Sequence, residues 1–117
     1  MKADLEKLIP LAPAALHILL ALAAKDLHGY AIMQEVARQS RGQYKLGPGT
    51  LYDNLQRLLD QGLVRDMGGR VGDTDSRRRY YRLSAAGRGI LTQEVKRLEG
   101  VVQAARLRLR ALEDERA

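Results

Sequence analysis

An apolar heptad pattern near the C-terminal end most constrains how this chain can fold. Positions that alternate in steps of four and three are all apolar: Leu91, Val95, Leu98, Val102, Ala105, Leu109 and Leu112. A helix with apolar a and d positions over three heptads packs lengthwise against another helix. The pattern predicts one long helix from an N-cap at Ser84 to about Glu113. The chain's own first helix is too short to cover this seam completely, so we expect a second copy of the chain to do so; two-fold dimers are the commonest oligomers.

Length and composition suit a single helical domain. The chain has 117 residues and no Cys, which excludes a disulfide scaffold, a zinc finger, an iron–sulfur protein and a thiol enzyme. A chain of this size can hold a core without such staples. The net charge is +6, which favours a polyanionic partner such as nucleic acid or an acidic membrane surface. Because Phe and Trp are absent, the core must consist of Leu, Ile, Val, Ala and Tyr, which favours helices.

The N-terminal part contains an uncharged run, residues 8–24, that partly resembles a signal peptide. Asp4 and Glu6 precede the run, and it is shorter than the roughly 20 residues that a membrane-spanning helix needs. We therefore expect a buried helix from Pro13 to Ala24 in a cytoplasmic protein without a membrane segment. Pro13 suits the first turn of that helix, where the backbone amide has no partner within the helix.

Two more helices are predicted before residue 62. The first runs from Tyr30 to Gln39, with Tyr30, Met33 and Val36 on its apolar face. The next begins at the segment GPGT, residues 47–50, and runs to about Gln61. Its leucines share one face, and the opposite face is polar: Thr50, Asp53, Gln56, Arg57 and Asp60. Such a face is either an ordinary solvated surface or a hydrogen-bonding surface for a partner.

The pattern then changes to that of strands. Residues 63–67 and 79–83 are predicted to form a hairpin, with residues 68–76 as a long loop. Four arginines stand beside two tyrosines in the segment RRRYYR, residues 77–82. Because side chains alternate along a strand, one Tyr packs inward while arginines at the loop edge reach outward. The sequence thus predicts a mainly α fold with a small, basic β-hairpin wing.

Catalytic and metal-binding patterns are missing. His17 and His28 stand apart, and neither has a second ligand at metal-binding spacing. The segment at residues 47–50 lacks the Gly-Lys-Ser/Thr of a phosphate-binding loop. Asp73 and Asp75 lack the Gly and the distant Glu of a calcium loop and are better suited to capping a turn. We expect neither an enzyme nor a bound cofactor.

Three blocks resemble the PadR family of transcriptional regulators. The segment HGYAI, residues 28–32, is similar to the start of the family's second helix. The segment GTLY, residues 49–52, which continues through Leu58 to Val64, resembles its recognition helix and the exit into the wing. The segment RRYYRLS, residues 78–84, followed by Gly87, resembles the second wing strand and the entry to the last helix.

The resemblance implies a winged helix-turn-helix DNA-binding domain at residues 1–84 and a coiled-coil-like dimerisation helix at residues 85–117. It also implies a homodimeric repressor that binds double-stranded operator DNA. In a helix-turn-helix, the second helix offers polar side chains to base edges in the major groove. We expect Thr50, Gln56 and Arg57 to have that role, and Lys45 and Tyr52 to contact phosphates. The wing residues are expected either to contact phosphates or to insert into the minor groove: Arg77, Arg78 and Arg79.

Two points stay open at the level of sequence. Asp53 stands where the family often has Pro; its carboxylate repels phosphate, yet it can accept a hydrogen bond from cytosine or stabilise the helix N-terminus. Some relatives bind small aromatic molecules between subunits, so an effector at the dimer interface is an open expectation. The alternatives to a regulator are a protein-interaction module that acts through its C-terminal helix and, less favoured, an RNA-binding protein.

Overall fold

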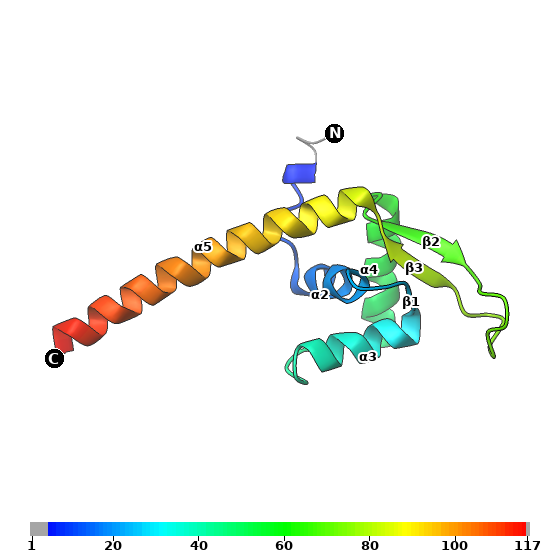
Figure 1. Ribbon diagram of the computed structural model, residues 1–117, viewed down its shortest axis with the longest axis horizontal. Helices are drawn as coiled ribbons and strands as arrows, with labels where there is room; N and C mark the ends of the chain where they lie inside the picture. Colours follow the sequence, from blue (N-terminus) through cyan, green and yellow to red (C-terminus); the bar gives the residue numbers. More distant parts are fainter. Residues whose placement is uncertain (1–4, 117) are drawn as a thin grey trace.

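The arrangement is a helical domain with a wing at one end and a long helix at the other (Figure 1). The computed structural model describes residues 5–116. Within that range the elements are α2 (Pro13–Leu22), β1 (Leu27–His28), α3 (Gly29–Gln39), α4 (Pro48–Asp60), β2 (Val64–Gly68), β3 (Tyr80–Leu83) and α5 (Ala85–Arg116). The predicted fold class is confirmed: the chain is mainly helical, with a small sheet as its wing. No helix in the described range is both long enough and apolar enough to cross a membrane.

Local sequence signals set the helix boundaries. Pro13 and Pro48 each lie in a first turn, as Pro prefers. The Ser84 side-chain oxygen accepts a hydrogen bond from the Gly87 amide at 2.9 Å, which makes Ser84 the N-cap of α5 as predicted. At the end of α4, Gly62 adopts a φ of 74°, a conformation that Gly adopts without steric cost.

Helix α2 forms the centre of the core and packs against α3, α4, α5 and β3. Its Ile18 and Leu19 are fully buried, as are the leucines on the inner face of α4. This confirms the expectation of a helix covered on several sides. Of the predicted apolar face of α3, Val36 is buried and Met33 packs half-buried against the core, whereas Tyr30 is 60% exposed. Ile32, which the prediction did not include, is fully buried.

The sheet has three strands rather than the two of the predicted hairpin. Its order is β1-β3-β2, and both pairings are antiparallel. Strand β1 lies between the helices predicted at residues 13–24 and 30–39, where no strand was predicted, because two residues are too short to show a strand period. An irregularity in register between Asp66 and Gly68 bends β2 towards the loop.

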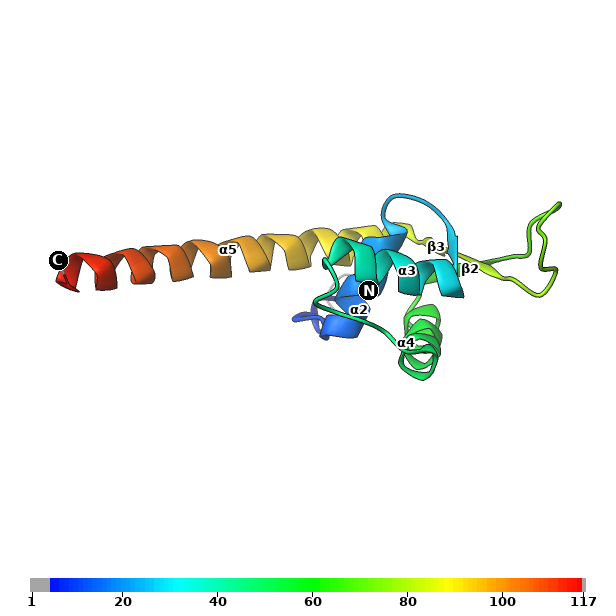
Figure 2. The same cartoon turned by 90° about the horizontal axis from the view of Figure 1, so that it is seen from below.

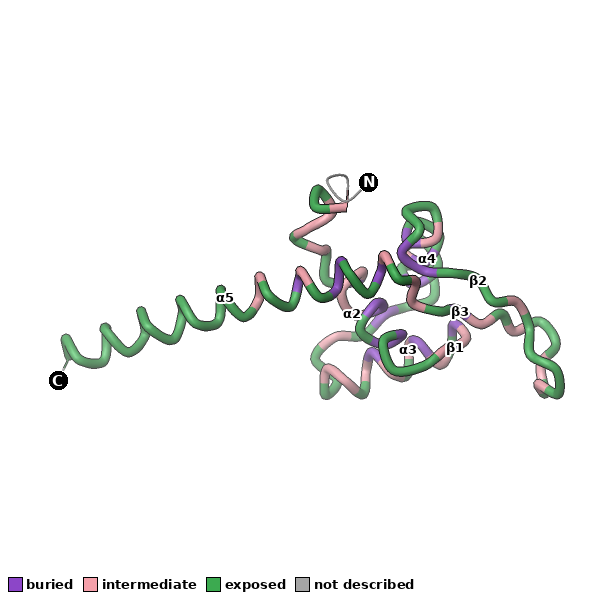
Figure 3. The backbone as a smooth tube through the Cα atoms, turned by 45° about the horizontal axis from the view of Figure 1, so that its top comes forward, coloured by how far each residue is buried: buried purple, intermediate pink, exposed green. Residues whose placement is uncertain are grey.

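Helix α5 has two distinct parts. Its first turns belong to the domain, and they contain the buried residues Gly87, Ile90, Leu91 and Glu94. Beyond residue 95 the helix leaves the domain; Arg97 and Leu98 are half-buried, and residues 99–116 are exposed. The molecule is therefore 63 Å long (Figure 3). Leu91, predicted as the first seam residue, is instead packed in the core of its own chain and only 8% exposed.

A buried carboxylate ties the N-terminal segment to α5. Glu94 is completely buried and accepts a hydrogen bond from the Leu11 amide at 2.6 Å. It also pairs with Arg97 one turn further along the helix. This contact fixes where the chain preceding α2 crosses α5.

Candidate nucleic-acid interface

The outward face of α4 is polar, as the sequence predicted. Leu51, Leu55 and Leu58 are buried, and Thr50, Asp53, Gln56, Arg57 and Asp60 are exposed on the other side. The Gln56 amide donates a hydrogen bond to the Asp60 carboxylate at 3.0 Å. The face therefore combines hydrogen-bond donors with two carboxylates. Seen from below, α4 lies along one side of the domain, with the wing extending beyond it (Figure 2).

Tyr52 lies on the flank of α4 and packs against the start of α3. A Cβ atom at Gly29 would lie 2.3 Å from the Tyr52 hydroxyl oxygen, so any other residue there would require the Tyr52 side chain to move. Tyr52 remains 51% exposed. The Gly in the HGY segment thus lets the Tyr52 ring lie against the start of α3.

Each of the three adjacent wing arginines is paired with an aspartate. Arg79, the residue before β3, forms an ion pair with Asp66 of β2 at 2.8 Å. Arg78 reaches Asp73 at 3.2 Å, and Arg77 lies 3.5 Å from Asp75. The sequence predicted these arginines as outward-reaching groups but did not predict their acidic partners.

The aspartates are also held by groups other than arginine. Asp73 accepts a hydrogen bond from the Tyr80 hydroxyl at 2.8 Å, Asp66 accepts one from the Gly68 amide at 2.8 Å, and Asp75 accepts one from the Arg77 amide at 2.9 Å. The expectation that Asp73 and Asp75 cap turns is confirmed by the bonds to backbone amides.

These hydrogen bonds keep the wing carboxylates ionised. The bond from Arg79 lowers the pKa of Asp66, and the bond from Tyr80 lowers the pKa of Asp73. Burial, followed by the charge of Arg78, lowers the pKa of His28. A neutral His28 agrees with its contact as N-cap of α3, because its Nδ1 accepts the Ala31 amide at 3.3 Å.

A groove of about 400 Å³ separates the wing from α3 and α4. Its walls include four residues of the predicted DNA-binding site, together with two aromatic residues and a histidine: Tyr52, Arg77, Arg78, Arg79, Tyr30, Tyr81 and His28. The fold therefore brings Tyr52 and the wing arginines to one surface. Tyr30 also lines this groove. Sequence reasoning missed it because its spacing placed it on the apolar face of α3.

The other predicted residues lie outside this groove. Lys45 is exposed in the loop before α4, and Gln56 is exposed on the outer face of α4. Arg57 lies on the opposite flank of α4 from Tyr52, beside a depression of about 160 Å³ that includes Leu8 and Leu11. The predicted set thus occupies the outer face of α4 and both of its flanks.

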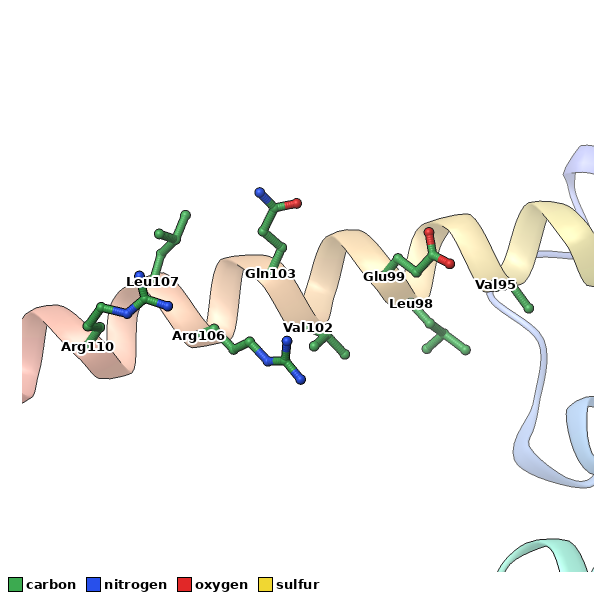
Figure 4. Close-up of a pocket in the computed structure, with 8 residues that line it drawn as sticks. All are labelled: Val95, Leu98, Glu99, Val102, Gln103, Arg106, Leu107 and Arg110. Carbon is green, nitrogen blue, oxygen red and sulfur yellow. The ribbon is translucent and has the colours of Figure 1, made fainter.

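The exposed part of α5 carries a second candidate surface. Val95, Val102, Leu109 and Leu112 of the predicted seam are between 40% and 60% exposed. An open groove of about 630 Å³ follows the helix and includes Val95, Leu98 and Val102. Figure 4 shows these three side chains along one side of α5, with Gln103 and Leu107 on the other.

Comparisons with known proteins identify the family. The family described as "Transcriptional regulator PadR-like family" matches residues 18–93. The chain is 39% identical over 92 residues to the transcriptional regulator Rv3488 of Mycobacterium tuberculosis, a match that covers 75% of this chain and 78% of that protein.

Solved structures show the same fold. A transcriptional regulator from Clostridium thermocellum is 25% identical, with a TM-score of 0.69, and the match covers 80% of this chain and 86% of that one. A PadR family regulator from Clostridium difficile superposes with a TM-score of 0.72 at 23% identity, over 84% of this chain and 99% of that one. The family match over more than half of the chain places this protein in the PadR-like family of transcriptional regulators.

Proposed function

We propose that this protein is a homodimeric transcriptional repressor that binds operator DNA through α4 and the wing. The observation that carries the proposal is the groove in which Tyr52 of α4 and three consecutive wing arginines meet. A polar helix beside a basic hairpin is suited to contacting base edges and the adjacent phosphates together. A Bacillus subtilis PadR structure, 21% identical and with a TM-score of 0.64, is a complex with operator DNA and supports this reading.

Within this proposal the predicted residues divide into two roles. Thr50 and Gln56 on the outer face of α4, and Arg57 on its flank, offer donors and acceptors to base edges. Phosphate contacts come from Tyr52 and Lys45 together with Arg77, Arg78 and Arg79. These contacts supply affinity and position the protein, whereas sequence preference comes from α4.

The seam of α5 supports the homodimer. Apolar residues at a and d positions stay exposed along a helix of 32 residues, and a second copy would remove them from water. Leu91 is excluded from this seam because its own domain covers it. An effector bound between the two helices stays part of this proposal; the groove beside Leu98 is formed by α5 alone, so the partner helix would have to complete such a site.

The test uses a labelled DNA duplex from upstream of the protein's own gene. Binding of the protein to this duplex is measured by fluorescence anisotropy at several salt concentrations. A scrambled duplex of equal length is the control. We expect affinity for the natural probe at least about a thousandfold above that for the scramble. Absence of binding to both duplexes at low salt would overturn the proposal and favour a protein-interaction role for α5.

A matched pair of variants tests the wing. For the natural duplex, Arg79→Ala should reduce the slope of log affinity against log salt concentration by about 0.9, the value for one lost phosphate contact. Arg116→Ala removes the same charge at the far end of α5 and should leave the slope unchanged. Equal slopes for the two variants would show that Arg79 does not contact a phosphate.

A further inference from the structure

The wing is less basic than its arginines suggest. Residues 65–82 contain six Arg but also three Asp, and each Asp is within 3.5 Å of one of the three consecutive arginines that face the groove. A phosphate that approaches Arg77, Arg78 or Arg79 therefore competes with a carboxylate already in place. The Arg77–Asp75 and Arg79–Asp66 pairs are mostly exposed, so each of these two is weak enough to exchange. The Asp73 side chain that pairs with Arg78 is only 7% exposed.

The carboxylates would stay in position after such an exchange. Asp66 remains bonded to the Gly68 amide at the irregularity of β2, and Asp73 remains bonded to the Tyr80 hydroxyl. These bonds do not involve the arginine partners. An arginine that moves to a phosphate thus leaves behind a fixed negative charge beside the DNA backbone.

We propose that Asp66, Asp73 and Asp75 are specificity-determining residues that hold the wing arginines away from phosphates in non-specific complexes. This inference rests on the proposed DNA-binding function. Non-specific affinity comes almost entirely from phosphate neutralisation, so arginines that remain paired reduce it directly. On the operator, docking of α4 brings the backbone close to the groove, and the arginines then exchange their carboxylates for phosphates.

The Asp66–Arg79 pair offers the sharpest test because it joins β2 to the residue just before β3. Asp66→Asn keeps an oxygen that can accept the Gly68 amide but removes the charge that holds Arg79. The matched control is Asp114→Asn, which makes the same change in net charge at an exposed position near the end of α5. Both proteins and the wild type are titrated with a scrambled duplex over a range of salt concentrations.

We expect Asp66→Asn to bind the scrambled duplex about two- to fivefold more tightly than Asp114→Asn, the range that corresponds to one exposed ion pair. Its salt slope should be steeper by about 0.9, because one more arginine reaches a phosphate. The double variant Asp66→Asn/Arg79→Ala should lose both effects. On the operator, the slope of Asp66→Asn should equal that of the wild type.

Three results would overturn the inference while leaving the proposed function intact. The first is equal affinity and equal salt slope of Asp66→Asn and Asp114→Asn on the scrambled duplex. The second is a gain in affinity that persists in the double variant without Arg79. The third is a salt slope that increases equally on the operator and on the scrambled duplex. Failure of the wild type to bind any duplex at low salt would instead overturn the proposed function itself. Thermal unfolding of each variant establishes that the domain is folded in the titrations.

Discussion

Gly87 and Gly89 lie two residues apart at the start of α5, yet replacing each with Ala should change stability in opposite directions. A Cβ at Gly87 would lie 2.1 Å from the Leu63 carbonyl oxygen and 2.7 Å from a methyl carbon of Leu83. The Leu63 oxygen belongs to the backbone and accepts the Ser84 amide at 3.0 Å, so it cannot move without disturbing the N-cap of the helix. At Gly89 the corresponding space is open.

The expected magnitudes follow from these contacts. Overpacking against a fixed backbone atom costs about 2–3 kcal/mol, which exceeds the helix-propensity gain of about 0.5–1 kcal/mol from Gly to Ala. Gly87→Ala should therefore lower the free energy of unfolding, and Gly89→Ala should raise it by the propensity gain alone. Urea denaturation followed by far-ultraviolet circular dichroism measures both, at one protein concentration because self-association adds to stability.

A shift of both variants in the same direction would refute the reasoning. If both variants are more stable, helix propensity dominates, and a Cβ at Gly87 does not clash with the Leu63 carbonyl oxygen. Two destabilised proteins would mean that Gly89 is covered in solution by a partner surface. Unchanged denaturant slopes are required for this comparison, because a change in slope signals a different unfolded or native state.

Other contacts give further expected outcomes. Glu94→Gln should lower the free energy of unfolding by about 1.5–3 kcal/mol, because it removes charge-assisted bonds to the Leu11 amide and Arg97. Arg97 lowers the pKa of Glu94 from its ordinary value of 4.5, so this stabilisation is complete above that pH and is lost as the pH falls through the lowered pKa; denaturation of both proteins at neutral and acidic pH should show the difference disappearing in acid. His28→Ala should cost about 1 kcal/mol through the lost N-cap of α3, whereas His28→Asn should retain most of the stability in the same denaturation assay. Leu98→Asp should yield a monomer in sedimentation equilibrium and weaken operator binding, and a variant that still sediments as a dimer would place the interface elsewhere.

The helices were predictable because local chemistry determines their limits. Ser84, Pro48 and Gly62 act within one turn of their own positions, through a side-chain cap, a fixed φ and a left-handed conformation. Such signals do not depend on tertiary contacts. They are therefore readable from the sequence, and the structure confirms the helices to within two or three residues.

Predictions that required knowledge of a packing partner succeeded less well. The apolar stripe of α5 continues without a break from the domain core into the exposed seam, so its period does not show that Leu91 is covered by its own chain. Tyr30 has apolar spacing, yet its ring lies at the groove beside the wing. In both cases the pattern identifies a face of the helix but not the surface that covers it.

The pairing of the wing arginines was beyond sequence reasoning for a more specific reason. Asp66 and Arg79 are 13 residues apart, and they meet only because β2 and β3 pair in one register up to an irregularity beside Gly68. A shift of one strand by one residue would place the two side chains on opposite faces of the sheet. Net charge of the segment is the same in either register, so composition correctly indicates a basic wing. Whether Arg79 meets Asp66 depends instead on strand register. In the proposed function, this aspartate is therefore as important as its arginine for how the wing would meet DNA.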